Sequence, residues 1–231
     1  KSSLLKEIYL TGYYEFEVIK FFDYFNYETF IDVGSNIGFF SLYLRKCKNW
    51  DVIAFEPYLK NYNFALKLMH LNKIKYNLIN KAVSISSGEE TLFIPSHKKF
   101  SVLSGCASLM KPGKIMKKMY GKQQYKKVNV CTISINEIIN KYNNNHVLVK
   151  LDTEGHELNI LNSLRNLKKI KTVDFIVEMN INDKSCNKIF KIFKDSGFNA
   201  YLMTNLGLVF EDRPLTLPKY DILVNDKDYG H

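Results

Sequence analysis

The stretch that decides the fold is Thr29–Leu44, which reads TFIDVGSNIGFFSLYL. Its first residues are apolar or β-branched, as expected for a short strand that is buried on both faces, and Asp32 lies where this strand ends. Gly34 and Gly38 then bracket a turn, and a helix is predicted after it. Glycine permits backbone angles that other residues avoid, and the N–H groups at a helix start are free to bind a ligand. We therefore predict a strand, a ligand-binding turn and a helix.

The glycine spacing and the next predicted strand narrow down the ligand. The glycines follow the pattern G-x-x-x-G, so the dinucleotide fingerprint G-x-G-x-x-G is not matched. The next strand, 51–55, is followed by Glu56 and Pro57. This carboxylate lies about 20 residues beyond the turn, where doubly wound sheets bind ribose hydroxyls. The carboxylate indicates a ligand that contains a ribose, and the glycine spacing disfavours a nicotinamide dinucleotide.

Four motifs follow one another along the chain. They are DVGSNIGFFSL at 32–42, AFEP at 54–57, NKAVS at 80–84 and VKLDTEGHELNIL at 149–161. In order and spacing they resemble the FkbM family of S-adenosylmethionine-dependent methyltransferases. Many methyltransferases share the first two motifs, whereas LDTEGHE is more specific. The resemblance runs from about residue 12 to about residue 180.

The resemblance implies S-adenosylmethionine as cofactor and a set of residues that bind it. These residues are Asp32, Gly34, Asn36, Gly38, Glu56 and Ala82. Asp32 and Gly34 would hold the methionine part, with Asn36 and Gly38 shaping the turn. Glu56 would bind the ribose hydroxyls, and the backbone at Ala82 would lie beside the adenine.

Predicted strands and helices alternate over most of the chain. Strands are expected at 29–33, 51–55, 77–83, 91–94, 128–133, 147–151, 172–178, 201–204 and 220–224. Helices are expected within 1–28, at 59–72, from 134 to 142 and from 183 or 185 to 197. This alternation predicts an α/β fold with right-handed crossovers. The resemblance implies a Rossmann-like methyltransferase fold, with a mainly parallel seven-stranded sheet and helices on both faces. The length of the chain predicts one domain over 1–231.

Residues 96–127 differ from the rest of the chain. They contain nine lysines and one histidine but no Asp or Glu, and they show little periodicity. Long segments of this kind are usually functional lids or disordered loops. Two interpretations stay open: a basic lid that favours an acceptor with a phosphate or carboxylate, or a solvated loop.

Carboxylates lie at the predicted ends of several strands. In an open parallel sheet, ligands bind beyond the carboxyl ends of the strands, near the point where the strand order reverses. The residues at such ends are Asp32, Glu56, Asp152 and Glu178. Lys150 shares a strand face with Asp152, since side chains two positions apart on a strand point the same way. We expect the four carboxylates to converge on one edge of the sheet.

Methyl transfer to a hydroxyl releases a proton, so a base within hydrogen-bonding distance helps. Asp152 is the first candidate, because it ends a buried strand and faces the predicted turn. His156 is the second, because a helix start favours a neutral, basic imidazole. Glu154 and Glu157 are expected to complement the helix start, with contact to the acceptor as a further interpretation for Glu154. Oxygen-rich edges can bind Mg²⁺, but D-x-E-x-H is no ligand signature, and no metal site is predicted.

Composition limits the remaining function classes. The chain has 231 residues, a formal net charge of +10 and four scattered cysteines without metal-ligand spacing. Without a signal-peptide pattern or an apolar run of ~20 residues, it is expected to be cytoplasmic and to lack a membrane span. The expected acceptor is a sugar, a glycan or another small hydroxyl compound, and the positive charge would suit an anionic one. The alternatives are a ribose O-methyltransferase acting on RNA, and a catalytically silent cofactor-binding subunit of a complex.

Overall fold

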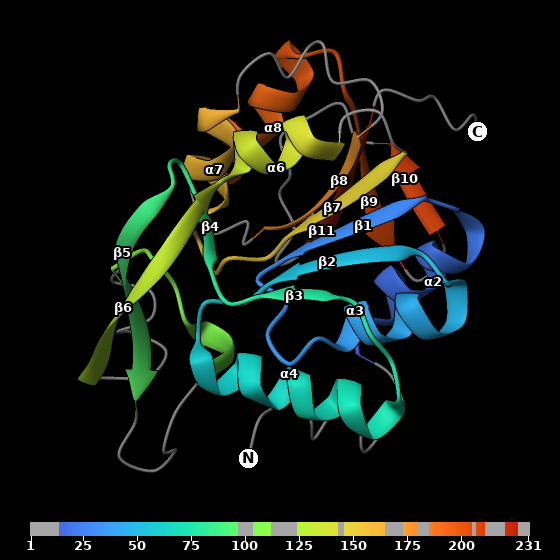
Figure 1. Ribbon diagram of the computed structural model, residues 1–231. Helices are drawn as coiled ribbons and strands as arrows, with labels where there is room; N and C mark the ends of the chain where they lie inside the picture. The colour runs from blue at the N-terminus through green and yellow to red at the C-terminus, as the bar shows by residue number, and fades with distance from the viewer. Residues whose placement is uncertain are drawn as a thin grey trace.

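The computed structural model describes residues 14–96, 104–111, 124–142, 146–164, 173–179, 185–204, 207–210 and 220–225. Within them, the main sheet has the order β10-β9-β11-β8-β7-β1-β2-β3 (Figure 1). Its strands are β1 (Thr29–Val33), β2 (Asp51–Phe55), β3 (Asn77–Ile79), β7 (Val147–Leu151), β8 (Val173–Met179), β9 (Asn199–Thr204), β10 (Gly207–Phe210) and β11 (Tyr220–Asn225). The strands from β8 to β3 are parallel, whereas β11 is antiparallel to both its neighbours. The sheet is therefore mainly parallel, as predicted.

The described part of this sheet has eight strands, so the predicted count of seven is wrong. The additional strand is β10, which forms an antiparallel pair with β9, with Leu208 opposite Met203. It extends one edge and leaves the order of the other strands unchanged. The five parallel strands form the block that carries the predicted site.

A second sheet has the order β4-β6-β5 and consists of β4 (Ala82–Ser84), β5 (Gly88–Ser96) and β6 (Gln124–Ser134). The single strand predicted at 77–83 is therefore wrong, because this stretch is divided between the two sheets. The Asn80 side chain donates to the backbone carbonyls of Glu56 and Pro57, at 2.7 and 3.1 Å. These bonds fix the chain after β3, and β4 then pairs with β6 instead.

Helices cover both faces of the main sheet (Figure 1). They are α2 (Phe16–Tyr24), α3 (Phe39–Tyr43) with its π-helical continuation η1 (Leu44–Lys48), α4 (Leu59–Asn72), α6 (Ile135–Tyr142), α7 (Glu157–Ser163) and α8 (Ser185–Asp195). α6, α7 and α8 share one hydrophobic core with Ile31, Val149 and Phe175 of the sheet. α2 and α3 share another with Phe30 and Leu148. This layering confirms the predicted Rossmann-like α/β class.

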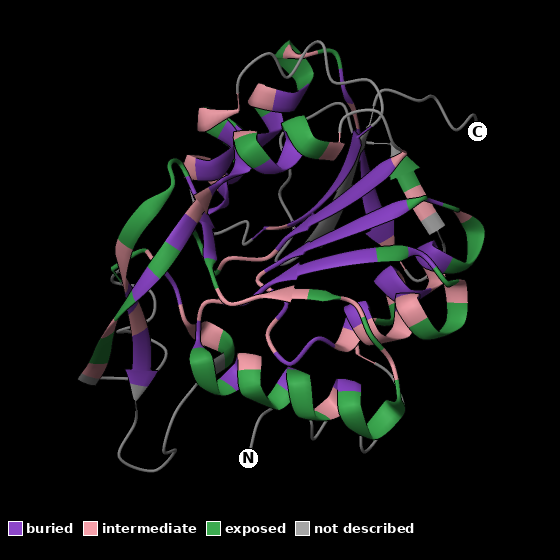
Figure 2. Cartoon of the chain, viewed as in Figure 1, coloured by how far each residue is buried: buried purple, intermediate pink, exposed green. Residues whose placement is uncertain are grey.

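The two central strands, β1 and β7, are buried along their whole length (Figure 2). Alternate side chains of β1 reach opposite cores, Phe30 on one face and Ile31 on the other. Burial on both faces explains the nearly continuous apolar sequence of both strands. Asp32 in β1 and Lys150 in β7 are charged exceptions, and they are register partners on neighbouring strands.

The structure describes the two unusual segments of the chain in part. In the N-terminal segment, the predicted helix is α2, and residues 1–13 lie outside the described ranges. Of the lysine-rich segment, 124–127 belong to β6, and 104–111 contain the short helix η2 (Ser104–Cys106). No helix in the described ranges combines the length and the apolar character that crossing a membrane would require.

Candidate active site

The strand order of the main sheet reverses between β1 and β7, with β2 and β3 on one side and β8 on the other. Ligands bind to such sheets beyond the carboxyl ends of the strands at this point. Here the chain leaves β1 through Gly34 and leaves β7 through Asp152. The Asp152 N–H donates to the Val33 carbonyl at 3.0 Å, so the two exits lie side by side.

Gly34 makes this close approach possible. Its φ of +83° lies in the left-handed region, which other residues rarely adopt, and a β-carbon there would overlap the Asp152 carbonyl oxygen. Asn36 also has a positive φ, and its N–H donates to Glu56 Oε2 at 2.9 Å. At Gly38, a β-carbon would overlap the Tyr76 hydroxyl. Both glycines have a left-handed backbone, and at Gly34 the neighbouring backbone also leaves no room for a side chain.

Glu56 supports the turn from the end of β2, where it is only 4% exposed. Its carboxylate accepts hydrogen bonds from the N–H groups of Asn36 and Tyr58, at 2.9 and 2.8 Å, and from the Asn61 side chain. Burial raises the pKa of Glu56 to about 8, although these hydrogen bonds act in the opposite direction. In its ionised form the carboxylate has about four acceptor positions, of which these bonds use three, so one remains for a hydroxyl donor. Ribose binding by Glu56 stays a prediction.

Asp32 is also buried, and its Oδ2 accepts a hydrogen bond from Ser41 Oγ at 2.6 Å. Burial raises the pKa of Asp32 to about 6, against the effect of the Ser41 hydrogen bond. Asp32 and Glu56 thus lie in the protein interior beside the turn. All four predicted carboxylates lie at the carboxyl ends of parallel strands, and Asp152 and Glu178 belong to the group described next.

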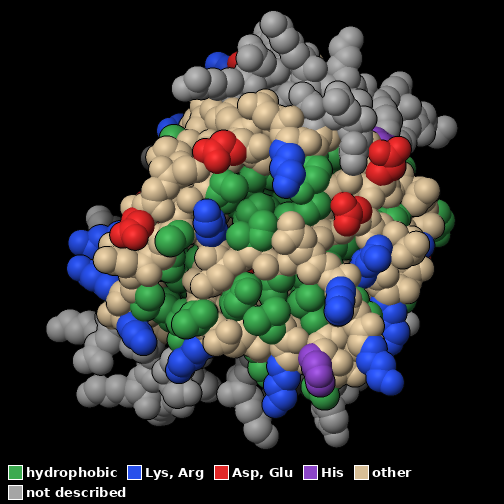
Figure 3. Space-filling view, viewed as in Figure 1, with side chains coloured by type: hydrophobic (Ala, Val, Ile, Leu, Met, Phe, Trp, Pro, Cys, Tyr) green, Lys and Arg blue, Asp and Glu red, His purple; other side chains and the backbone are tan. Residues whose placement is uncertain are grey.

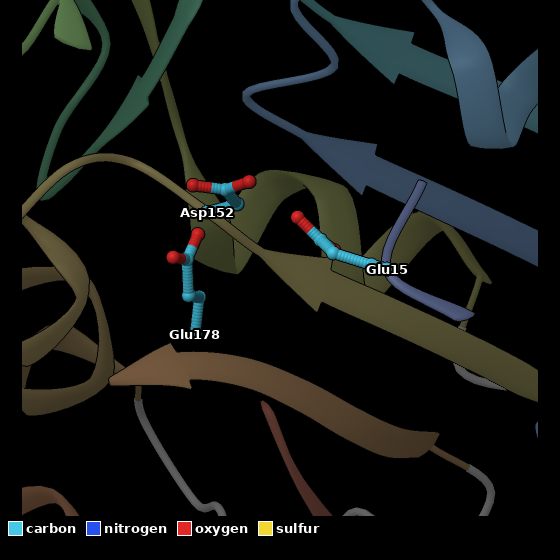
Figure 4. Close-up of side chains that lie close together, drawn as sticks. All are labelled: Glu15, Asp152 and Glu178. Carbon is cyan, nitrogen blue, oxygen red and sulfur yellow. The ribbon is translucent and has the colours of Figure 1, made fainter. Parts of the chain in front are cut away.

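Three carboxylates from separate parts of the chain point toward one another at the carboxyl ends of β7 and β8 (Figure 4). They belong to Glu15, Asp152 and Glu178, and one oxygen of each lies within 4.8 Å of the others. The Glu15 Oε2 atom is buried and has no hydrogen-bond partner among the described residues. Glu15 also has a φ of +47°, and strained residues of this kind gather at functional sites. We call these three residues the carboxylate cluster.

Lys150 supplies a positive charge to the carboxylate cluster. Its side chain is 2% exposed, and its Nζ lies 2.9 Å from Asp152 Oδ2 and 3.6 Å from Glu15 Oε2. The ammonium also lies 5.1 Å from the centroid of the Phe40 ring. A buried charge needs such partners, so the lysine and the carboxylates stabilise one another. The contact confirms that Lys150 and Asp152 share a strand face.

The loop after Asp152 is held by Glu157, the first residue of α7. The Glu157 carboxylate accepts hydrogen bonds from the Thr153 N–H and hydroxyl, at 2.7 and 2.8 Å, and from the Gly155 N–H at 3.0 Å. Burial raises the pKa of Glu157. Glu154 and Gly155 form the bend with positive φ, and Glu154 is exposed. The motif LDTEGHE therefore encodes a loop that is closed by its own last residue, while the predicted contact of Glu154 with the acceptor stays a prediction.

His156 is buried in a network that leads toward the second sheet. Its Nε2 lies 3.1 Å from Ser84 Oγ, which donates to Glu90, and its Nδ1 lies 3.3 Å from the Asn159 side-chain nitrogen. Burial lowers the pKa of His156. This pattern fits a neutral imidazole with its proton on Nε2. Both ring nitrogens of His156 are thus engaged within the protein, and its role as a base stays a prediction.

Residues 104–111 lie against both strand exits. A β-carbon at Gly105 would be 3.4 Å from the Asn36 side-chain nitrogen. Ser108 is buried, and its Oγ donates to the Thr153 carbonyl at 3.2 Å. This part of the lysine-rich segment thus contacts both the glycine turn and the loop after β7, while its role as a lid stays a prediction.

The segment after β3 contains one residue that the sequence analysis assigned to the site, Ala82, and one that it did not, Asn80. Ala82, predicted beside the adenine, is buried in the core of the second sheet with Tyr58 and Leu92, and its role stays a prediction. Asn80 was not predicted, although its side chain fixes the backbone at Glu56. Its position in the motif NKAVS was the available signal.

The FkbM methyltransferase domain family matches residues 32–200 of this chain. The match spans the glycine turn, Glu56, Lys150 and the loop held by Glu157, and it covers more than half of the chain. The chain belongs to the FkbM methyltransferase family. No curated protein matches it in sequence.

This FkbM methyltransferase also resembles solved structures of other methyltransferases at low identity. An S-adenosylmethionine-dependent O-methyltransferase from Thermotoga maritima has a TM-score of 0.47 and 10% identity, over 99% of this chain and 73% of that one. Precorrin-6y C5,15-methyltransferase from Geobacter metallireducens has a TM-score of 0.44 and 10% identity, over 86% of this chain and 79% of that one. The N-terminal domain of human METTL16, in complex with S-adenosylhomocysteine, has a TM-score of 0.43 and 11% identity, over 88% of this chain and 63% of that one. Because these scores are below 0.5, the fold class rests on the strand order instead.

S-adenosylmethionine is the cofactor of this FkbM methyltransferase. The residues at the strand exits fit it. The glycine turn has two left-handed glycines at the end of a central strand, and the buried Ser35 hydroxyl has no hydrogen-bond partner in the described ranges. Glu56 retains acceptor capacity for a ribose hydroxyl. The turn and Glu56 are therefore the residues that would hold the cofactor.

Proposed function

We propose that this FkbM methyltransferase methylates a hydroxyl group of a sugar, a glycan or another small acceptor, with Asp152 as the base. One observation carries the proposal: Asp152 belongs both to the exit beside the glycine turn and to the carboxylate cluster. The same residue thus contacts the turn assigned to the cofactor and faces a group of hydrogen-bond acceptors. A hydroxyl bound there would lie between the methyl donor and a base.

The main contribution of the protein to methyl transfer is to position the donor and the acceptor. S-adenosylmethionine supplies a methyl group that is already activated by its sulfonium. The glycine turn and Glu56 orient the donor, and the carboxylate cluster orients the acceptor for in-line attack. Asp152 accepts the hydroxyl proton as the oxygen acquires the methyl group. Lys150, 2.9 Å from Asp152, holds the base in place through the reaction.

The carboxylate cluster favours a neutral acceptor that is rich in hydroxyl groups. Glu15, Asp152 and Glu178 carry three negative charges when ionised, and Lys150 balances one of them. A phosphate at this place would be repelled, whereas sugar hydroxyls would donate hydrogen bonds to the carboxylates. The proposed acceptor therefore differs from the anionic one that the lysine-rich segment alone would favour.

Methylation of an RNA ribose is the second candidate, supported by the charge of the surface. No Asp or Glu occurs from residue 57 to residue 88, which contains α4 with its exposed Lys60 and Lys67. Figure 3 shows Lys and Arg side chains along the lower rim of this face, where no Asp or Glu is visible. Such a surface attracts phosphates with an affinity that falls steeply as salt increases.

The test is a methyl-transfer screen with radiolabelled S-adenosylmethionine. Neutral sugars and glycans, phosphorylated sugars and short RNA are compared at low and moderate salt. We expect label on a neutral hydroxyl acceptor, with the rate nearly independent of salt. Transfer to RNA alone, with steep salt dependence, would favour the second candidate. Cofactor binding without transfer to any acceptor would point to a silent subunit in a complex.

A further inference from the structure

The carboxylate cluster has the composition of a divalent cation site. Three carboxylate oxygens from Glu15, Asp152 and Glu178 lie within 4.8 Å of one another, and carboxylates are the ligands that Mg²⁺ and Ca²⁺ prefer. The Lys150 ammonium already contacts two of these residues, at 2.9 Å from Asp152 and 3.6 Å from Glu15. The cluster therefore contains a positive charge provided by the chain itself.

We infer that the Lys150 ammonium takes the place of a divalent cation in the carboxylate cluster, so that this methyltransferase orients its acceptor base without a metal ion. Lys150 is then a positioning residue that acts through Asp152. The inference deepens the proposed function, on which it rests for the role of Asp152, but the contact between Lys150 and the cluster is independent of it.

The position of Lys150 is fixed by the fold. Its residue lies on a buried strand, two positions before Asp152, so its side chain leaves the same strand face. The Phe40 ring lies 5.1 Å from the ammonium and Leu148 precedes it on that face, which surrounds the charge with apolar groups on the side away from the carboxylates. The Lys150 side chain is 2% exposed, and these contacts hold its ammonium beside the carboxylates. The charge is thus part of the cluster in the folded protein.

The Lys150 ammonium offsets the repulsion among the three carboxylates of the cluster. Carboxylates at this separation repel one another, and partial burial makes the repulsion stronger than in water. Glu15 keeps a φ of +47° while its buried Oε2 faces Lys150. One ammonium offsets part of the repulsion, and it also opposes the approach of a second cation. Mg²⁺ needs closely placed oxygens on all sides, and here one side is occupied by the lysine.

The test is a Mn²⁺ titration followed by electron paramagnetic resonance, on the full chain as wild type, Lys150→Met and the double variant Lys150→Met/Glu178→Gln. Methionine keeps the length of the stem and removes the charge. We expect no stoichiometric Mn²⁺ binding by the wild type, at least tenfold tighter binding by Lys150→Met, and loss of that gain in the double variant. The double variant is the matched control, because it differs from Lys150→Met in one cluster carboxylate.

Two results would overturn the inference: one bound Mn²⁺ in the wild type that Glu178→Gln removes, or no gain of Mn²⁺ affinity in folded Lys150→Met. If Lys150→Met does not fold, a comparison of the wild type with the two single variants Glu15→Gln and Glu178→Gln still tests the inference. A metal site would bind Mn²⁺ in the wild type and lose it in both variants. S-adenosylmethionine affinity is measured on every sample. Cofactor binding together with a wild-type metal site would overturn this inference and leave the proposed function standing.

Discussion

The carbonyl oxygen of Asp152 occupies the position where Gly34 would carry a β-carbon. This contact joins the exit of β1 to the exit of β7, and Asp152 N–H reinforces it through the Val33 carbonyl at 3.0 Å. The turn assigned to the cofactor and the residue proposed as base are therefore built as one unit. A change in either exit is expected to affect the other.

Gly34→Ala is expected to disrupt this unit. The substitution combines a left-handed backbone with a steric overlap, so it should destabilise the protein by more than the roughly 1–2 kcal/mol of the backbone strain alone. Gly197→Ala is the matched control, because its φ of +84° is nearly the same as +83° at Gly34 but nothing lies within 4 Å of its β-carbon. Urea unfolding measures the loss in unfolding free energy of each variant. Equal losses in the two variants would contradict the close contact between Gly34 and the Asp152 carbonyl.

Burial of Glu56 predicts a pH dependence of stability. Its pKa is raised from 4.5 in the unfolded chain to about 8 in the folded protein, so the folded state retains a proton that the unfolded state loses. The free energy of unfolding of the cofactor-free protein should therefore fall as the pH rises from about 5 to about 8. Asp32, with a pKa of about 6, contributes in the same direction in the lower part of this range.

Glu56→Gln isolates the effect, since glutamine resembles the protonated carboxyl and does not titrate. We expect a flatter dependence of the unfolding free energy on pH between 6 and 8 in this variant than in the wild type, measured by urea unfolding. Glu89→Gln, at an exposed position, should leave the slope as in the wild type. An identical slope in Glu56→Gln and wild type would show that Glu56 is ionised throughout.

Asp152→Asn is expected to separate catalysis from cofactor binding. Asparagine keeps an oxygen for the Lys150 ammonium but is no base, so turnover should fall roughly 100- to 10,000-fold. Affinity for S-adenosylmethionine should change little, since the backbone at 152 stays in place. Asp51→Asn, exposed at the start of β2, serves as the control for removal of one negative charge. Unchanged turnover in Asp152→Asn would remove Asp152 from the mechanism.

His156→Gln is expected to lower stability and not catalysis. The imidazole joins Ser84 to Asn159 in the interior, and breaking such a buried network costs about 1–3 kcal/mol. Turnover per folded molecule should stay close to that of the wild type. His70→Gln, on the exposed side of α4, should change neither quantity. Loss of turnover at full stability would restore His156 as the base.

The sequence was most informative where a local pattern and the sheet act together. Thr29–Leu44 predicted β1, the glycine turn and the following helix, because strand burial and glycine spacing are both visible locally. Lys150 and Asp152 were placed on one face by strand periodicity alone. The cytoplasmic location and the acceptor have no such local signal, and both stay predictions.

Tertiary contacts explain what the sequence did not show. Glu15 lies 137 positions before Asp152, and its position beside Asp152 and Glu178 depends on the fold of the whole sheet. The division of 77–83 depends on bonds from Asn80 to carbonyls that are more than 20 positions away. Asp32 and Glu56 follow from the strand pattern, but the hydrogen bonds that they accept come from Ser41 and Asn36, 9 and 20 positions away.

The most direct test of the central claim is a calorimetric titration of the wild type with S-adenosylmethionine and S-adenosylhomocysteine, with NAD as control and Gly34→Ala as the matched variant. The account predicts one binding site per chain for the first two ligands, none for NAD, and weakened binding in the variant. Binding of NAD in their place, or equal S-adenosylmethionine affinity in wild type and folded Gly34→Ala, would contradict the assignment of the turn as the cofactor site.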